Sequence, residues 1–115
     1  MREGGQPVPP AILVISCGAG SVEHEVLAGV EEEGVPAVLE RRVGNGDAHA
    51  LARVAAADSS LGVGVGIDSH GGVSVAHEKL TGPTDGLFGG AESARNLGHN
   101  AARMVVGIPL RLVVP

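Results

Sequence analysis

Short apolar runs and amphipathic stretches alternate along the chain, separated by glycine-rich turns. Residues 11–15 form a continuous aliphatic run, which is typical of a strand buried on both faces. Over residues 21–33, valine and leucine recur at helical spacing, with Ser21 as the expected N-cap and Gly34, before Val-Pro, as the stop. Residues 38–43 predict a second strand, so the first three elements have the order strand, helix, strand.

A second helix and two further strands are predicted next. Asp47 is placed to cap a short alanine-rich helix that runs to about residue 57. Residues 61–67 alternate glycine with branched aliphatic residues, so one face of this predicted strand is bare and suits a helix packed closely on it. Residues 73–77 follow a Gly-Gly turn and predict an antiparallel hairpin partner.

The last third of the chain predicts an irregular loop, a helix and an edge strand. The loop covers residues 79–90, and the helix begins at Ala91 or Ser93 and ends near residue 106, before Gly-Ile-Pro. Residues 110–114 predict the edge strand. The expected inner face of the helix carries five apolar residues: Ala94, Leu97, Ala101, Met104 and Val105.

Together these elements predict an α/β fold in one domain. The alternation of strands and helices indicates a three-layer α/β/α domain with a mixed, mostly parallel sheet of four to five strands. The chain has 115 residues, so we expect a single domain over residues 11–115 after a flexible leader over residues 1–10. Because the chain has 19 glycines and Phe88 as its one aromatic residue, the core must be aliphatic.

Charge and cysteine content narrow the classes of function. The chain has 13 acidic and 8 basic residues and a net charge of −5, so we expect neither nucleic acid nor an anionic membrane as the principal partner. No apolar run approaches the roughly 18 residues of a membrane span. Cys17 is the single cysteine, which is typical of a buried thiol in a reducing compartment. We therefore expect a cytoplasmic protein.

The sequence contains no recognisable catalytic constellation. The Gly-Ala-Gly turn at residues 18–20 resembles part of a dinucleotide-binding turn, but Glu23 stands where the third glycine is needed, and its carboxylate would oppose a phosphate. No Gly-x-Ser-x-Gly motif is present to hold a nucleophilic serine. Turn capping and solvation explain two Asp/His pairs in loops more simply than a metal site does: Asp47 with His49 and Asp68 with His70.

The most informative segment is the acidic end of the first predicted helix, at residues 31–33. Three carboxylates there lie at the negative end of the helix dipole, which is unfavourable unless a cation or a partner offsets their charge. At 100° per residue, Glu32 shares the outer face with Glu25, and the small residues Ala28 and Gly29 lie between them. This face suits docking by another subunit that carries a cation or shares a metal ion.

A second polar face is expected on the last helix, opposite its apolar stripe. Contact with a partner and simple exposure to solvent are equally compatible with its sequence. Four residues form this face: Arg95, Asn96, His99 and Arg103.

Two segments of the sequence resemble one protein family. Residues 25–36, with the acidic run followed by Gly-Val-Pro, and residues 100–109, Asn-Ala-Ala-Arg-Met-Val-Val-Gly-Ile-Pro, are the segments concerned. They resemble the small subunit of the reactivating factor for coenzyme B12-dependent diol and glycerol dehydratases, and the likeness spans nearly the whole chain. The medium subunit of the dehydratase itself, which is larger, looks like a relative that contains this domain.

The resemblance implies a non-catalytic chain that works through other polypeptides. Its partner would be a large actin/Hsp70-type ATPase subunit that binds ATP or ADP, and its indirect partner the B12-dependent dehydratase. The small subunit would leave, and the dehydratase medium subunit would take its place, so that damaged cobalamin is exchanged for adenosylcobalamin. In the family a glutamate of the acidic helix joins a magnesium site shared with the large subunit, and motif matching points to Glu32. The resemblance implies no cofactor in the isolated chain, and a bacterial microcompartment is one expected setting within the cytoplasm.

Two other interpretations stay open on the sequence alone. The chain could be a divergent or truncated medium subunit of the dehydratase. It could also be a free-standing small-molecule binding module that uses the loops around residues 68–70. The sequence does not identify the diol or triol concerned, nor the stoichiometry of a complex.

Overall fold

A computed structural model describes residues 9–80 and 87–113 of the chain. None of its helices, in these two ranges, is long and apolar enough to cross a membrane. The elements follow in the order β1 (Ile12–Ser16), α1 (Gly20–Glu32), β2 (Ala37–Arg41), α2 (Ala48–Asp58), β3 (Val63–Ile67), β4 (Val73–His77), β5 (Phe88–Gly89), a 3-10 turn η1 (Ala91–Ser93) and α3 (Ala94–Val106).

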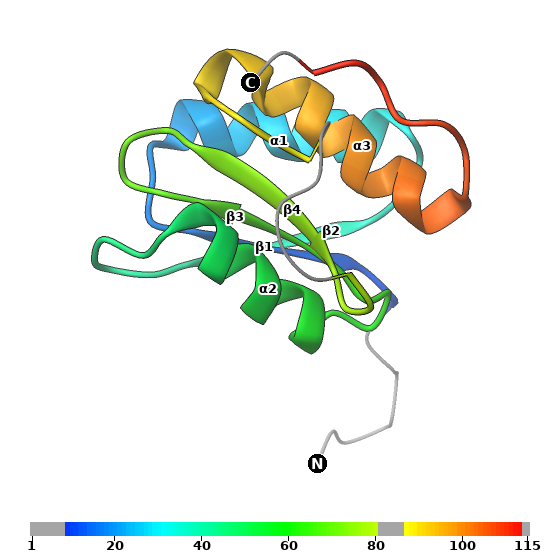
Figure 1. Cartoon of the computed structure of the whole chain (residues 1–115), viewed down its shortest axis with the longest axis horizontal. Helices are drawn as coiled ribbons and strands as arrows, with labels where there is room; N and C mark the ends of the chain where they lie inside the picture. Colours follow the sequence, from blue (N-terminus) through cyan, green and yellow to red (C-terminus); the bar gives the residue numbers. More distant parts are fainter. Residues whose placement is uncertain (1–8, 81–86, 114–115) are drawn as a thin grey trace.

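The predicted three-layer architecture is confirmed. The five strands form one sheet in the order β2-β1-β3-β4-β5, with α2 on one face and α1 and α3 on the other (Figure 1). β1 pairs in parallel with both β2 and β3, whereas β4 pairs antiparallel with β3 and with β5. Four strands therefore point in one direction and β4 runs against them, which agrees with a mixed, mostly parallel sheet.

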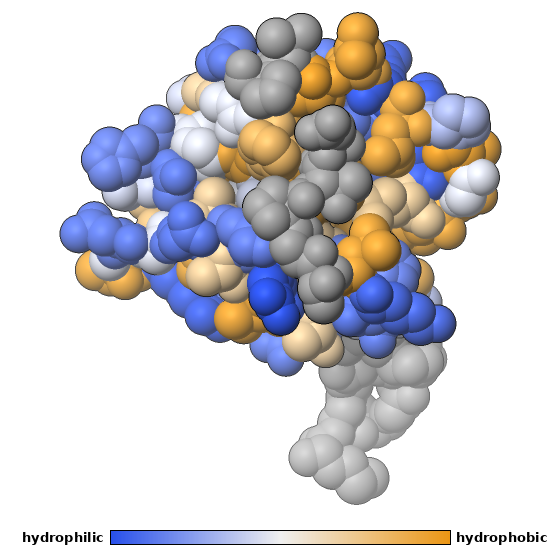
Figure 2. All heavy atoms as spheres, in the orientation of Figure 1, coloured by the Kyte–Doolittle hydropathy of each residue, from blue (hydrophilic) through white to orange (hydrophobic). Residues whose placement is uncertain are grey.

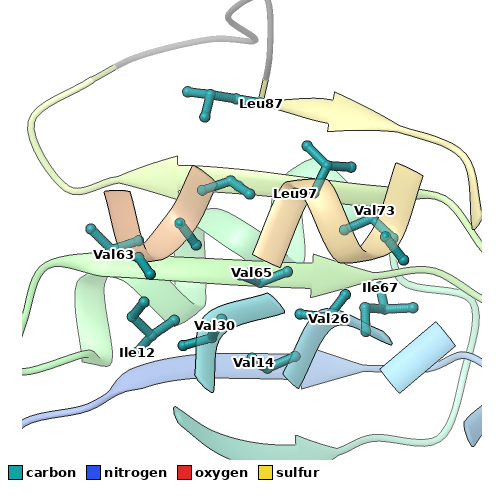
Figure 3. Packing of buried hydrophobic residues seen from close by; sticks show 14 of the residues in the cluster. Ile12, Val14, Val26, Val30, Val63, Val65, Ile67, Val73, Leu87 and Leu97 are labelled. Atoms are coloured by element: carbon teal, nitrogen blue, oxygen red, sulfur yellow. The ribbon is translucent and has the colours of Figure 1, made fainter. Parts of the chain in front are cut away.

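An aliphatic core fills the space between the sheet and the α1/α3 layer. Val14 and Val65 project from the central strands towards Val26 and Val30 of α1, and Leu97 of α3 closes the same cluster (Figure 3). All five residues are fully buried. The valines of α1 recur every four residues, so burying this stripe is what fixes the rotation of α1 about its own axis.

The bare face of β3 receives α2, as the sequence predicts. A Cβ on Gly64 would lie 2.2 Å from the backbone nitrogen of Ala56, and a Cβ on Gly66 would lie 2.1 Å from the carbonyl oxygen of Ala48. Only glycine allows the helix backbone to approach the strand so closely. The thiol of Cys17, predicted to be buried, is half-buried beside a small cluster on this face of the sheet.

Two details of the helix ends test the capping predictions. Asp47 caps α2 as predicted, since its Oδ2 accepts a hydrogen bond from the backbone nitrogen of Ala50 at 2.9 Å. The prediction for Ser21 is wrong, because α1 begins at Gly20 and its N-cap is Ala19, which provides no side-chain hydrogen bond. The chain turns before Ser21 because Gly18 packs directly against the end of β3, where a Cβ would lie 2.6 Å from the carbonyl oxygen of Asp68.

The predicted edge strand is also wrong over the part that the structure describes. Residues 110–113 form no strand, and the edge position beside β4 belongs to β5, within the segment predicted to be irregular. Because Val75 donates its backbone N–H to the carbonyl oxygen of Leu87 at 2.7 Å, that segment extends the pairing of β4. Residues 1–8, 81–86 and 114–115, which include most of the predicted leader, lie outside the described residues.

Replacement of Val26 by aspartate should unfold the domain. The substitution buries an unpaired carboxylate in the α1 stripe, which costs about 4 kcal/mol or more, a large share of the stability of a typical domain. Val54 on α2 is 42% exposed and gives a matched control. Circular dichroism during urea unfolding should show a stable Val54→Asp and an unfolded Val26→Asp; a cooperative transition for Val26→Asp near that of the parent would contradict the orientation of α1.

Candidate functional site

The helices α1 and α3 touch through their backbones at two glycines. A Cβ on Gly29 would lie 2.1 Å from the carbonyl oxygen of Arg95, and a Cβ on Gly98 would lie 2.2 Å from the carbonyl oxygen of Val26. Real Cβ atoms do not approach other atoms so closely, so this crossing requires glycine at both positions. The contact brings polar side chains of the two helices within reach of one another.

Six side chains meet along this contact, and together we call them the acid–base seam: Glu25, Glu32 and Glu33 with Arg95, His99 and Arg103. The pairs follow the same order along both helices, from Glu25 with Arg95 to Glu33 with Arg103, so α1 and α3 run in the same direction. The seam therefore runs from the middle of α1 to its carboxyl end, and from the first turn of α3 to its last.

Glu32 is held by two side chains of α3. Its Oε1 accepts from Nε of Arg95 at 3.2 Å and lies 2.9 Å from Nε2 of His99, while its Oε2 accepts from Nη2 of Arg95. Arg95 also reaches Oε1 of Glu25, at 3.4 Å from its Nη1. One guanidinium thus bridges the two carboxylates that the sequence places on a common helix face.

Glu33 lies deeper in the seam. Its side chain is 13% exposed, against 44% for Glu32. Its Oε2 lies 2.7 Å from Nδ1 of His99 and accepts from Nε of Arg103 at 2.8 Å. The two ring nitrogens of His99 thus face one carboxylate each, Nε2 that of Glu32 and Nδ1 that of Glu33.

The seam offsets the unfavourable charge at the end of α1. The guanidinium of Arg95 lowers the pKa of Glu32, and hydrogen bonds from Arg103 and then His99 lower the pKa of Glu33. The Glu32 carboxylate in turn raises the pKa of Arg95. The cation that the sequence analysis required for these carboxylates is therefore supplied by the chain itself.

This arrangement corrects the prediction of a smooth docking patch between Glu25 and Glu32. Gly29 is buried beneath α3, and Ala28 is half-buried. The polar face predicted on α3 does make contacts, but three of its four residues contact α1 of the same chain. The fourth, Asn96, accepts from Nη1 of Arg111 at 3.0 Å.

Glu32 suits a metal ion as one ligand among several. It offers a part-exposed carboxylate, the hard oxygen ligand that Mg2+ prefers. Among the described residues no group of three or more His, Cys, Asp or Glu could hold a metal ion. The assignment of Glu32 as a magnesium ligand stays a prediction.

An apolar strip continues from the seam. Arg103 also donates from Nη1 to the carbonyl oxygen of Pro109 at 2.9 Å, and the buried Asn100 bonds both the backbone N–H and the carbonyl oxygen of Arg111. These bonds hold the chain after α3 against the helix. Apolar atoms gather on the side of the molecule where this segment runs (Figure 2). Four exposed residues form the strip: Val106, Ile108, Leu110 and Leu112.

A second buried carboxylate lies at the other end of α1. Glu23, whose side chain is 4% exposed, accepts from Nε and Nη2 of Arg41 at 3.0 and 2.9 Å. The hydrogen bond from Arg41 lowers the pKa of Glu23 against the opposing effect of burial. The first turn of α1 therefore carries a carboxylate that an arginine of β2 neutralises.

The two Asp/His pairs come only partly together. Asp47, His49 and Asp68 line a cavity of about 450 Å3 at the end of the sheet, but His70 does not. Asp68 accepts from the backbone nitrogens of His70 and Gly72, each at 2.8 Å, and Asp47 caps α2. Both aspartates therefore have the turn-capping role that the sequence favours.

Comparison with known proteins places this fold in a family. The family described as dehydratase medium subunit matches residues 9–111. The chain belongs to this family. It is 36% identical over 114 residues to the propanediol dehydratase-reactivating factor small subunit of Salmonella typhimurium strain LT2, which covers 95% of this chain and 96% of that protein. It is 35% identical to the diol dehydratase-reactivating factor small subunit of Klebsiella michiganensis, over 94% of this chain and 88% of that one.

Solved structures of family members agree with the fold. A structure described as glycerol dehydratase reactivase superposes with a TM-score of 0.81 at 32% identity, covering 90% of this chain and 97% of that one. A diol dehydratase-reactivating factor complexed with ADP and Mg2+ gives 0.76 at 33% identity, over 91% and 99%. The predicted resemblance to reactivating-factor small subunits is confirmed. The two segments that carry it, residues 25–36 and 100–109, meet at the acid–base seam.

Sequence reasoning missed the pairing of Gly29 with Gly98. Each glycine interrupts a helix at a cost of about 1 kcal/mol relative to alanine, so each signals a close approach by another backbone. Neither glycine identifies the other as its partner. For that reason the seam was not predictable as an internal contact.

Gly29→Ala should destabilise the domain by about 3 kcal/mol, because the new methyl group forces α1 and α3 apart. Gly20→Ala is the matched control, since a Cβ there meets nothing closer than 4.0 Å, and we expect it to stay within about 1 kcal/mol of the parent. Thermal unfolding should separate the two variants by more than about 10 °C. Equal melting temperatures would contradict the backbone contact.

Arg41→Gln should change how stability depends on pH. The lowered pKa of Glu23 stabilises the fold above its unfolded pKa of about 4.3, and this contribution is lost as the pH falls through the folded value. The variant should therefore be less stable than the parent at pH 7, and the difference should shrink below pH 4. Urea unfolding at pH 7, 5 and 3.5 measures this.

Arg42→Gln is the control for the pH experiment. It removes the same charge from an exposed pair with Glu40, so we expect a small effect at every pH. A difference between Arg41→Gln and the parent that stays constant from pH 7 to 3.5 would contradict the prediction.

Proposed function

We propose that this chain is the small, non-catalytic subunit of a chaperone-like factor that reactivates a B12-dependent diol or glycerol dehydratase. The end-to-end similarity to reactivating-factor small subunits is the observation that carries the proposal. Its partner would be a large subunit with ATPase activity, which would bind ATP or ADP. We place the factor in the cytoplasm, with a bacterial microcompartment as one setting.

The surface of the chain supports a role in docking. The apolar strip exposes four large side chains beside the acid–base seam, and contiguous exposed apolar surface is typical of sites that contact another protein. Arg103 connects the two features, since it bonds both Glu33 and Pro109. We propose that the strip and the outer part of the seam form one contact surface for the large subunit.

Reactivation would proceed by exchange of related domains. A dehydratase medium subunit with the same fold would compete with this chain for one site on the large subunit. The nucleotide on the large subunit would set the preference between them, which is a coupling between two binding equilibria. Departure of the medium subunit would loosen the dehydratase, so that damaged cobalamin leaves and adenosylcobalamin enters.

Glu32 would provide this chain's ligand to a Mg2+ ion at the junction with the large subunit. The side chain lies at the open side of the seam and its carboxylate has the required chemistry. The metal would join this carboxylate to ligands that the large subunit provides. In this role the chain needs no metal or nucleotide of its own before it docks.

Co-purification distinguishes the proposal from its main alternative. We expect the tagged full chain to retain the large ATPase subunit when both are co-expressed. Recovery instead with the large and small subunits of the dehydratase, together with cobalamin, would identify a divergent medium subunit. Titration of the isolated chain with cobalamins and nucleotides should give no heat; measurable heat would favour a small-molecule binding module.

Glu32→Ala should weaken association with the large subunit by at least roughly tenfold in Mg2+-containing buffer, because the junction loses a metal ligand. Its melting temperature should stay close to the parent's, because exposed ion pairs add little stability. Glu31→Ala is the matched control, since Glu31 is an exposed neighbour outside the seam. Equal affinities for the two variants would remove Glu32 from the junction.

A further inference from the structure

Both carboxylate oxygens of Glu32 are already bonded within the undocked chain. Oε1 is shared by Arg95 and His99, and Oε2 accepts from Arg95. Mg2+ binds carboxylate oxygens at about 2.0–2.1 Å, and a guanidinium at hydrogen-bonding distance from the same oxygens would repel it. A metal ion at Glu32 therefore competes with Arg95 for the same carboxylate, and binds it more tightly once the guanidinium withdraws.

Of the three basic side chains in the seam, Arg95 has the most freedom to withdraw. Its side chain is 46% exposed, whereas His99 is 7% exposed and also bonds Glu33. Arg103 bonds Glu33 and the carbonyl oxygen of Pro109, and it does not contact Glu32. Withdrawal of Arg95 frees Oε2 completely.

Glu25 provides a second position for the guanidinium. Its Oε1 already lies 3.4 Å from Nη1 of Arg95, and its side chain is 41% exposed. The transfer needs only rotation of the arginine side chain, because the backbones of α1 and α3 are fixed against each other at Gly29 and Gly98. The positive charge thus stays on the surface of the seam when Glu32 is released.

We infer that Arg95 is a positioning residue that sets the metal affinity of Glu32, by holding its carboxylate in the undocked chain and moving to Glu25 when the metal binds. This inference rests on the proposed role of Glu32 at the junction with the large subunit. It assigns opposite effects to two neighbours of Glu32. Removing Arg95 should raise the affinity of Glu32 for the metal ion. Removing Glu25 should keep Arg95 on Glu32 and so lower that affinity.

Association of the full chain with the large subunit, measured by biolayer interferometry across a Mg2+ titration, tests the inference. Arg95→Gln should lower the Mg2+ concentration at half-maximal association by roughly fivefold or more. Glu25→Gln should raise it. Arg42→Gln, which removes a cation that pairs with Glu40 outside the seam, should leave it within about twofold.

The outcomes separate this inference from the proposed function. The inference is overturned if Arg95→Gln needs the same Mg2+ concentration as the parent, or a higher one, for half-maximal association. This comparison requires that association of the parent depends on Mg2+ and that Glu32→Ala removes this dependence. Weaker binding of Arg95→Gln at saturating Mg2+ also overturns it, because Arg95 would then contact the partner directly. If association of the parent does not change with the Mg2+ concentration, Glu32 has no metal role at the junction, and the inference is overturned with it.

Discussion

The backbone contact between α1 and α3 at Gly29 and Gly98 determines where the charged groups of this molecule lie. Because the two helix backbones touch, the side chains that flank the contact lie within reach of one another, and the carboxylates at the end of α1 pair with the arginines of α3. The buried valine stripe of α1 fixes the rotation of that helix, and the glycines fix its distance from α3. Together these two constraints leave the seam residues little choice of partner.

The seam is graded from its enclosed side to its open side. Glu33 is nearly enclosed and is bonded by His99 and Arg103, so its contacts serve to hold the end of α1 and the chain after α3. Glu32 and Arg95 are each about half exposed, where water screens their attraction and makes exchange of partners inexpensive. One network can thus combine a fixed inner part with an outer part open to other ligands.

Sequence patterns predicted most of the fold because apolar periodicity and glycine placement act locally. The bare face of β3 and the cap at Asp47 are examples, since each depends on residues within one or two elements. β5 was missed because its two residues have no periodicity of their own and pair only through β4. The helical wheel placed Glu32 and Glu25 on one face correctly, but an angle around a helix does not reveal which neighbour covers that face. The internal pairing with Arg95 therefore required the structure.

Ion pairs neutralise carboxylates at both ends of α1. At the amino end Arg41 neutralises the buried Glu23, and at the carboxyl end the cations of α3 neutralise the acidic run. Helix ends are the usual places where an α/β domain binds phosphates or cations, and here the chain's own side chains fill both. The apolar strip and the acid–base seam are joined through Arg103, which bonds both Glu33 and the carbonyl oxygen of Pro109, so the proposed contact surface can include both.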